Sequence, residues 1–293
     1  MKKSLAVSLA LLGCLGFNHV ADAEMLINFE DFSSSSDYQL FGGAQRVDNS
    51  IQLSAQGTKN TAGAIWFNTP VDVSNFNVAF SYTFSGGQFT GADGMVFVIQ
   101  DPDSPKYFGG TGGAIGYGGT IIKDVEQPGI TNSIGVEYDS WRNDERGDNG
   151  SSNHVGINVN GSSESLAQSS VSPTFNGTGT WYSWIDYDGT TLSVFVSQSN
   201  AKPASPTLTY GSSASPFVIS DYTGSSTGLV GLTASTGGVT QTTTLNSFGF
   251  QPTGTIGVVP EPSTLALFGT GAVFAGIASR RKARKISLAE EEV

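Results

Sequence analysis

Disulfide bonds within the chain are excluded, because the 293-residue sequence contains a single cysteine, Cys14. Basic residues are also few, with 14 Lys and Arg against 25 Asp and Glu, so the formal net charge is −11. A chain with this charge is a poor partner for nucleic acid or for an anionic membrane surface. A neutral ligand or a divalent cation fits such a chain better.

Helical periodicity is missing between residues 24 and 250, where short apolar runs alternate with turns rich in Gly, Ser, Asn and Thr. Many short strands are typical of a β-sandwich, whose two sheets can bury a core without disulfides. The runs that we expect to be strands are Asn77–Phe84, Gly94–Gln100, Ser133–Ser140, His154–Asn160, Thr180–Tyr187, Thr191–Gln198, Gly228–Thr233 and Thr244–Gln251. The sequence therefore predicts one all-β domain over residues 24–250.

The first 23 residues have the features of a secretory signal peptide. Two lysines precede an apolar run from Leu5 to Leu15, and Ala21-Asp22-Ala23 provides a small-residue cleavage site. We therefore expect residues 1–23 to be removed and the mature chain to begin at Glu24. A second cleavage remains open, because Leu11-Leu12-Gly13-Cys14 resembles a lipoprotein box that would leave the cysteine lipidated.

The C-terminal part has an apolar run that is short for a membrane anchor. Pro260-Glu261-Pro262 precedes a run from Thr264 to Ala278, whereas a helix that spans the bilayer needs about 20 residues. A basic cluster at 280–285 would keep the tail on the cytoplasmic side and the domain outside. We divide this end into a linker (251–259), the motif with its short helix and basic tail (260–285), and an acidic terminal tail (286–293).

This order of motif, apolar run and basic cluster resembles the PEP-CTERM sorting signal of Gram-negative bacteria that make exopolysaccharide. The resemblance implies processing by an exosortase, with only transient insertion of the short helix into the inner membrane. The mature protein is then expected to be released or to stay at the cell surface. An ordinary tail anchor is the alternative. Without both ends the net charge is about −13, which again disfavours nucleic acid as a partner.

The richest group of ligand-type side chains lies between Glu137 and His154. Glu137 and Asp139 are two residues apart in an apolar strand pattern, so their carboxylates project from the same face of the strand. Such a pair repels itself unless a cation lies between the two groups. Asn143 and Asp148 follow in a loop, and His154 begins the next apolar run.

This set of side chains has two interpretations. An acidic loop in an acidic protein is most often a solvated surface, and a single histidine is most often not a ligand. Carboxylates within a strand are different, because charged groups are rarely buried without a partner. Carboxylate and amide oxygens suit Ca²⁺, whereas the imidazole nitrogen suits a transition ion such as Mn²⁺. The pattern therefore favours a metal site.

The same run resembles the metal loop of the legume-type (L-type) lectins. Their pattern is V-E-x-D-aromatic-x-N…D…H-x-G-I-x-V-N, and this sequence has Val136–Asn143, Asp148 and His154–Asn160 in that order. Further segments that resemble the family, also in chain order, are Gly91–Ile99, Gly112–Gly116, Trp181–Val194, Gly228–Gly237 and Asn246–Phe250. The resemblance implies a concanavalin A-like, legume-lectin-like jelly-roll β-sandwich that binds carbohydrate.

For a sugar, the resemblance implies a fixed acceptor, hydrogen-bond donors and an aromatic surface. Asp93 is expected to accept hydrogen bonds from two adjacent hydroxyls, and the Ala92–Asp93 peptide bond is expected to be cis. The Gly113 N–H and the Asn143 amide are expected to donate, while Trp141 stacks on the sugar ring. The final loop, Ser235 to Gln241, is expected to flank the sugar and tune specificity, with Ser235 and Thr236 as its contacts.

For metal ions, the resemblance implies two adjoining structural sites. Asp139 and Asp148 are expected to bridge the two ions. The remaining expected ligands are Glu137 and His154 for the Mn²⁺-type site, and Asn143 and the Trp141 carbonyl for the Ca²⁺ site. Asp144 is an alternative to Asp148, which we favour because it lies six residues before His154.

Two other classes of protein compete with a lectin. Some glycoside hydrolases share this sandwich, but retaining hydrolysis needs two carboxyl groups flanking the bond, and the related enzymes use an E-x-D-x-x-E triplet. Here Arg142 occupies the third position, so we expect no enzymatic activity. The other class is a matrix or adhesion protein in which metal only stiffens the domain. The sequence predicts an exported protein that binds neutral glycans or exopolysaccharide.

Overall fold

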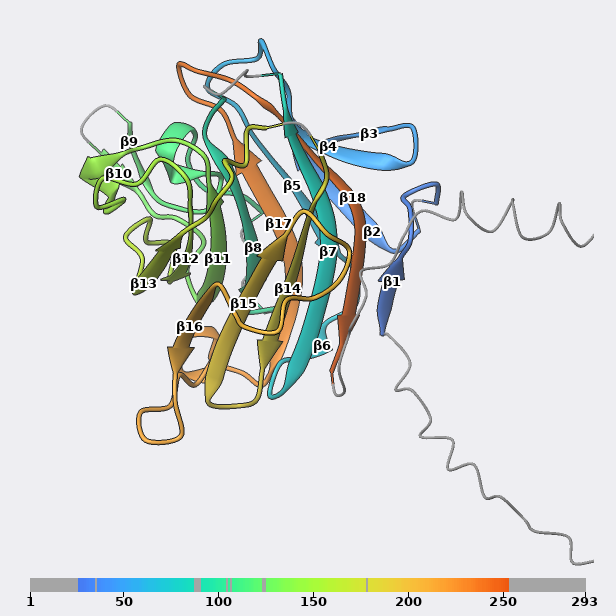
Figure 1. The fold of residues 1–293 in the computed structure, drawn as a ribbon, viewed down its shortest axis with the longest axis vertical. Helices are drawn as coiled ribbons and strands as arrows, with labels where there is room; N and C mark the ends of the chain where they lie inside the picture. The colour runs from blue at the N-terminus through green and yellow to red at the C-terminus, as the bar shows by residue number, and fades with distance from the viewer. Residues whose placement is uncertain are drawn as a thin grey trace, which may run out of the picture.

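The computed structural model describes residues 26–252, apart from 35, 87–90, 104, 106, 123–124 and 178. Almost all regular structure in this range is β-strand (Figure 1). The strands are β1 (Ile27–Phe29), β2 (Tyr38–Gly42), β3 (Gln45–Val47), β4 (Ser50–Ser54), β5 (Ala62–Phe67), β6 (Val71–Asp72), β7 (Phe76–Ser85), β8 (Gly94–Gln100), β9 (Thr120–Ile122), β10 (Val125–Gln127), β11 (Ser133–Asp139), β12 (His154–Val159), β13 (Ala167–Ser170), β14 (Trp181–Tyr187), β15 (Thr191–Ser197), β16 (Leu208–Gly211), β17 (Thr227–Ser235) and β18 (Thr242–Gln251). The other elements are two 3-10 turns, η1 (Gly112–Ala114) and η2 (Asp144–Arg146), and a one-turn helix, α1 (Ser220–Thr223).

The strands form two antiparallel sheets of eight strands each. The first, called here the β7 sheet, has the order β16-β15-β14-β7-β18-β4-β3, with β1 added on β18. The second, the β8 sheet, has the order β13-β12-β11-β8-β17-β5-β2, with β6 paired to β17. Strands β9 and β10 form a separate pair. Neighbours in both sheets are often far apart in the sequence, so most of the pairing is long-range.

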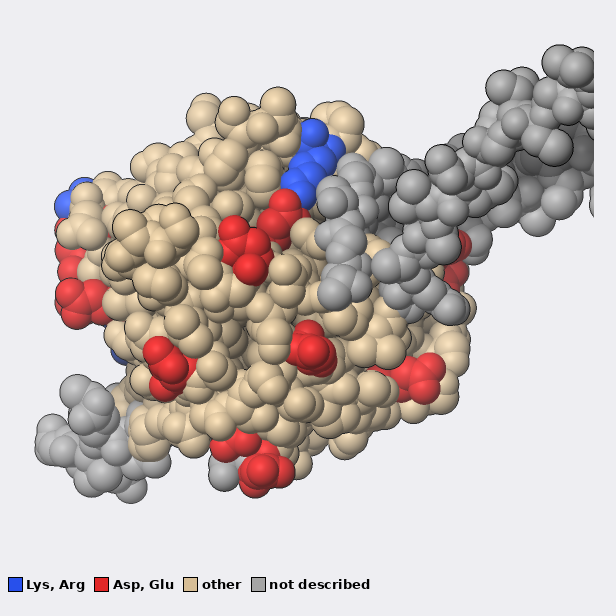
Figure 2. All heavy atoms as spheres, turned by 90° about the horizontal axis from the view of Figure 1, so that it is seen from below, with Lys and Arg blue, Asp and Glu red and all other residues tan. Residues whose placement is uncertain are grey.

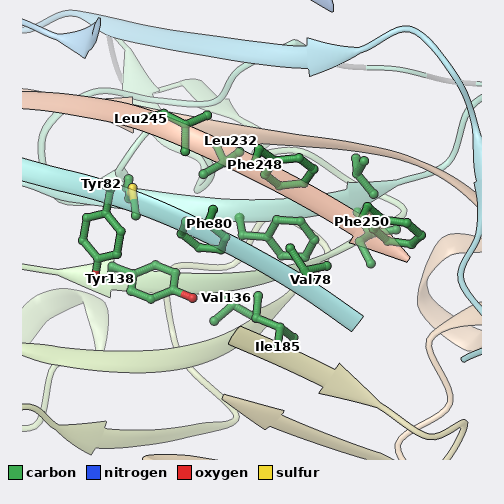
Figure 3. Close-up of a cluster of buried hydrophobic side chains, with 14 of the residues drawn as sticks. Val78, Phe80, Tyr82, Val136, Tyr138, Ile185, Leu232, Leu245, Phe248 and Phe250 are labelled. Atoms are coloured by element: carbon green, nitrogen blue, oxygen red, sulfur yellow. The ribbon is translucent and has the colours of Figure 1, made fainter. Parts of the chain in front are cut away.

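The main core lies between the two sheets, as Figure 3 shows. Val78, Phe80 and Tyr82 of β7 point into it, because alternate side chains of a strand project from the same face. In β18 the buried residues Leu245 and Phe248 are three apart, and a register shift against β7 lies between them. This bulge keeps both side chains on the core side of the sheet.

A second apolar cluster covers the outer face of the β8 sheet. Val96 and Val98 of β8 pack there against Ile115 and Tyr117, which belong to the segment that follows η1. The alternate residues of β8 face the main core, so this strand is buried on both faces throughout its length. Burial on both faces explains why the sequence of β8 is continuously apolar. The packing of the second cluster also holds the η1 segment against the sheet.

All eight predicted strands are present, with ends that differ by no more than two residues. The sequence analysis missed β1–β6, β9, β10, β13 and β16, most of which are short. Strand β18 continues through Gln251, the first residue of the expected linker. The predicted signal peptide and the C-terminal sorting segment lie outside the described residues.

The surface carries little charge on the face that Figure 2 shows. Separate Asp and Glu side chains are scattered over it, and Lys and Arg are scarce, whereas most of the described surface there is uncharged. This distribution agrees with the net charge of −11 and provides no basic patch for a polyanion on that face.

Candidate functional site

Strand register brings the predicted ligands together at one edge of the β8 sheet. Asp139 ends β11, and it pairs with Gly94 at the start of β8 and with His154 at the start of β12. Asp93 directly precedes Gly94, so its carboxylate belongs to the same edge. The antiparallel pairing of β8, β11 and β12 is therefore what gathers side chains from three separate parts of the sequence.

Asp139, Asp148 and His154 form a compact buried cluster. Each offers one ligand atom, and the three atoms lie within 4.8 Å of one another. None of these residues exposes more than 4% of its surface, and Nδ1 of His154 has no hydrogen-bond partner. Two carboxylates and an imidazole make a suitable donor set for a divalent ion.

The charges of this cluster are unfavourable unless they are neutralised. Burial raises the pKa of Asp139 well above its usual value, and the nearby carboxylates of Glu137 and Asp148 raise it further. Burial also raises the pKa of Asp148 to about 6, although a hydrogen bond from the Asn143 N–H and the charge of His154 oppose this shift. A cation between these carboxylates would favour their charged forms.

Glu137 lies beside the cluster and is held by several donors. Its Oε1 atom is 3.2 Å from Nε2 of His154 and also accepts a hydrogen bond from Ser165. Its Oε2 atom accepts a hydrogen bond of 3.0 Å from Nδ2 of Asn158. These contacts orient both the carboxylate and the imidazole. The role of Glu137 as a direct ligand stays a prediction.

The two candidates for the distal acidic ligand lie in different surroundings. Asp148 is buried in the cluster, whereas the side chain of Asp144 is 52% exposed and pairs with the Arg142 guanidinium at 2.8 Å. This ion pair lowers the pKa of Asp144. Gly147, with a φ of 95°, ends η2 and turns the chain so that Asp148 returns to the site.

Asp93 is almost fully buried, with 4% of its surface exposed. The Ala92–Asp93 peptide bond is cis, which confirms the prediction for this bond. The Asp93 N–H donates to the Ser235 carbonyl, and the Asp93 carbonyl accepts from the Ser140 N–H at 3.0 Å. Its Oδ2 atom is buried without a partner. Burial raises the pKa of Asp93 to about 7, while a hydrogen bond from the Gly237 N–H and the charge of Arg146 lower it.

Two glycines bring the backbone close to the side chains of Asp93 and Asn143. A Cβ atom on Gly237 would lie 3.2 Å from Oδ2 of Asp93, and one on Gly113 would lie only 2.5 Å from Oδ1 of Asn143. That Asn143 oxygen is also buried without a partner. The Gly112 N–H donates to the Thr236 carbonyl, which joins the η1 turn to the final loop. Asp93, Gly113, Asn143 and Gly237 are called the Asp93 site below.

The remaining predicted sugar contacts differ in how far they are exposed to solvent. Trp141 is partly exposed, and its backbone N–H donates to Oδ1 of Asp139 at 2.6 Å. Ser235 and Thr236 are fully buried, and their hydroxyls donate to the carbonyls of Gly112 and Thr58. In this structure they fix the loops around the site and present no hydroxyl to a ligand, which differs from the expected direct contact.

The sequence analysis assigned no role of their own to two residues that brace the Asp93 segment, although Gln241 ends the loop expected to flank the sugar. Nδ2 of Asn176 donates to the Gly91 and Ser140 carbonyls, at 2.9 and 3.2 Å. Oε1 of Gln241 accepts a hydrogen bond of 3.1 Å from the Ser140 hydroxyl. Both come from loops far from Asp93 in the sequence, and an isolated Asn or Gln in a loop carries no recognisable pattern.

Comparison with known proteins identifies the family. The model of the legume lectin domain matches residues 25–263. The chain belongs to the legume lectin family. A curated relative, a lectin of Leucomphalos mildbraedii, is 26% identical over 242 residues, which cover 76% of this chain and 93% of the relative.

Solved structures of lectins share the fold. A lectin from Bauhinia forficata, solved in complex with GalNAc, matches with a TM-score of 0.64 and 20% identity, over 78% of this chain and 98% of that chain. Peanut lectin, solved with a 9mer peptide, matches with a TM-score of 0.62 and 23% identity, over 79% and 98% of the two chains. These likenesses confirm the concanavalin A-like sandwich.

The family defines the general activity of this lectin domain. It is a carbohydrate-binding protein of the lectin type and not an enzyme, so the hydrolase alternative is excluded. The PEP-CTERM protein-sorting motif matches residues 258–282, which confirms the resemblance at the C-terminal end and indicates export and sorting. Within residues 26–252, as far as the structure describes them, no helix is long and apolar enough to cross a bilayer.

Proposed function

We propose that this lectin domain binds a neutral sugar at the Asp93 site and holds Ca²⁺ and Mn²⁺ beside it. The observation that carries the proposal is a set of three buried polar atoms without partners at one sheet edge: Oδ2 of Asp93, Oδ1 of Asn143 and Nδ1 of His154. Burying a polar atom without a hydrogen-bond partner costs free energy, so such a set indicates groups that bind a ligand.

In the proposed sugar complex, Asp93 accepts hydrogen bonds from two adjacent hydroxyls through a carboxylate that is almost fully buried. The Gly113 N–H donates, because the absence of a side chain leaves the backbone open to close approach. The Asn143 amide donates from the opposite side. Trp141, which is partly exposed, stacks on the apolar face of the ring.

The buried cluster of Asp139, Asp148 and His154 provides suitable ligands for the proposed ions. We assign Asp139 and Asp148 to both ions, Glu137 and His154 to the Mn²⁺-type ion, and Asn143 with the Trp141 carbonyl to Ca²⁺. When bound, the ions supply positive charge that favours the ionised carboxylates. The proposed role of the ions is structural, because Asn143 belongs both to the proposed Ca²⁺ site and to the Asp93 site.

For its place in the cell, we propose that the mature lectin begins near Glu24 and is released by an exosortase near Pro260-Glu261-Pro262. Its C-terminal apolar run then spends only a short time in the inner membrane. The sorting motif supports this course, and an exopolysaccharide at the cell surface is the proposed ligand.

A glycan array, probed with protein loaded with Ca²⁺ and Mn²⁺ and again after EDTA treatment, tests the proposal. Binding that EDTA abolishes, together with stoichiometric metal by elemental analysis, is expected. Asp93→Ala should abolish glycan binding and retain metal, because two sugar hydroxyls then lose a charged acceptor, a loss of roughly 2–5 kcal/mol. A folded, metal-loaded protein that binds no glycan would instead support the matrix protein.

A further inference from the structure

An exposed aromatic surface lies on the outer face of the β8 sheet, at its β2 edge. It consists of Phe41 in β2 and of Tyr107 and Phe108 in the segment that leads to η1, and it is called the aromatic shelf below. Tyr107 and Phe108 are 46% and 37% exposed. Within the described part of the chain, they are the only aromatic residues among the exposed large hydrophobic side chains.

The aromatic shelf is fixed by contacts with the underlying sheet. The rings of Phe41 and Tyr107 stack with their centroids 3.9 Å apart and their planes 5° from parallel. Nε1 of the buried Trp66 donates to the Tyr107 carbonyl at 2.7 Å, and Phe41 packs against the cluster on the outer face of the sheet. The ring of Phe108 lies next to Gly42, where a Cβ atom would come within 3.2 Å of it. A rigid apolar ring at the surface loses little entropy when a ligand covers it.

The aromatic shelf lies on the same sheet as the Asp93 site, three strands away from it. Strands β2, β5, β17 and β8 are neighbours in this order, and Gly42 pairs with Gly63, Ala62 with Ser235, and Ser235 with Gly94. These three steps between strands amount to about 14 Å. The chain after Phe108 is tied down by the hydrogen bonds from Gly109 and Gly110 to the backbone beyond η1.

The surface between the shelf and the Asp93 site offers uncharged polar groups. Asn60 is exposed and Thr61 is partly exposed, and both are bound to the final loop: the Asn60 N–H donates to the Gly237 carbonyl, and the Thr236 N–H donates to the Thr61 carbonyl. The Thr61 hydroxyl is bonded to the Thr236 hydroxyl at 3.2 Å, which leaves the exposed Asn60 amide as the polar group for a ligand made of linked pyranose rings. Each such ring has an apolar face and a hydroxylated rim.

We propose that the aromatic shelf is a second subsite for a neutral polysaccharide whose first ring occupies the Asp93 site. This inference rests on the proposed function, and it adds that the lectin prefers an internal stretch of chain or a long oligosaccharide over a monosaccharide. Phe108 and Tyr107 stack on a ring several units away from the one that Asp93 holds. The gain in affinity comes from apolar area removed from water at a surface that is already in place.

The test uses the whole lectin domain with its metals and a set of defined ligands. Glucose, mannose, galactose and N-acetylglucosamine are each offered to the protein as a series from the monosaccharide to the hexamer, and affinities are measured by calorimetry. Wild type should bind the longer members of the preferred series about tenfold more tightly than the monosaccharide. A double variant, Tyr107→Ala with Phe108→Ala, should lose this gain and keep the monosaccharide affinity.

The variants are designed to separate binding from folding. The Trp66 hydrogen bond goes to the backbone carbonyl of Tyr107, so it survives in the double variant. Leu166→Ala removes an apolar side chain that is also 41% exposed but lies next to β13, and it should leave every affinity unchanged. A wild type whose affinity does not depend on ligand length, or a double variant that keeps the gain, overturns the subsite.

The outcomes also separate this inference from the proposed function. If Asp93→Ala loses the monosaccharide and the shelf variant behaves as wild type, the primary site is right and the shelf is wrong. If wild type binds no saccharide of any length, both fail. An equal loss of affinity for all lengths in the shelf variant would mean that the rings only support the fold, which also rejects the subsite.

Discussion

A methyl group at Gly113 is the smallest change that should disable the Asp93 site. The Cβ atom of an alanine there would lie 2.5 Å from Oδ1 and 2.6 Å from Cγ of Asn143, and 3.0 Å from Cδ of Arg146. Distances below 3.0 Å between such atoms are not tolerated, so the Asn143 amide must move. Gly113 does not adopt a positive φ, and the substitution therefore perturbs space and not backbone conformation.

The size of the effect follows from which group gives way. Overpacking in a closed core costs about 1–3 kcal/mol, but Asn143 is partly exposed and can swing away, so the loss of stability should be near the lower limit. The displaced amide removes a donor to the sugar, worth about 1 kcal/mol, and the new methyl blocks the approach to the Gly113 N–H. Together these losses should weaken glycan binding at least about tenfold.

Calorimetric titration of Gly113→Ala with the best-binding glycan of the array measures this loss. A parallel Ca²⁺ titration should also show weaker binding, because Asn143 is a proposed Ca²⁺ ligand. Gly238→Ala is the matched control, since it lies in the neighbouring loop and its Cβ atom would have no heavy atom within 4 Å. If Gly113→Ala binds glycan and Ca²⁺ as wild type does, the assignment of the sugar to the Gly113–Asn143 corner is refuted.

Three further predictions concern the metals and the chain ends. Asp139→Ala should lose metal, glycan binding and melting temperature together, whereas metal retained at full occupancy by elemental analysis would contradict its bridging role. Because the folded-state pKa of Asp148 is raised from 3.8 to about 6, the metal-free fold binds more protons than the unfolded chain between these values. Its free energy of unfolding should therefore fall as pH rises through this window in urea titrations with EDTA, and a rise would count against the buried, unneutralised cluster. In a host with an exosortase, mass spectrometry should find a mature chain that begins near Glu24 and ends near Pro260-Glu261-Pro262, and a surface-exposed product that still carries Arg280 to Lys285 would speak against processing.

The local sequence pattern was sufficient to predict a strand where the residues alternate strongly or form a continuous apolar run. The residues of β8 are all buried because each face of that strand meets its own cluster, and the apolar run Gly94–Gln100 marked it clearly. Short strands such as β3, whose three residues are all exposed, have no such pattern. Such strands form because they pair with the free edge of a neighbouring strand. A short window of the sequence does not encode this pairing.

The candidate site was predicted in its parts and not in its arrangement. The spacing from Glu137 to His154 indicated a metal loop, and it favoured Asp148 over Asp144. The buried cluster that contains Asp148, and the ion pair of Asp144 with Arg142, are features of the folded chain. Ser235 and Thr236 were expected to touch the sugar, but both are fully buried and their hydroxyls donate to the backbone carbonyls of Gly112 and Thr58.

The sequence by itself determined the fold class, the positions of the longer strands, the sorting motif and the ligand types of the metal loop. Those features depend on neighbours in the chain: alternation along a strand, an apolar run followed by a basic cluster, and carboxylates two residues apart. Only the tertiary structure decided that Asp93 lies beside Asp139, that Asn176 and Gln241 brace the Asp93 segment, and that the aromatic shelf lies on the same sheet as the Asp93 site. These contacts join residues brought together by antiparallel pairing across the β8 sheet and by loops from the β7 sheet, and the free energy of burying both faces of β8 selects that pairing over the alternatives.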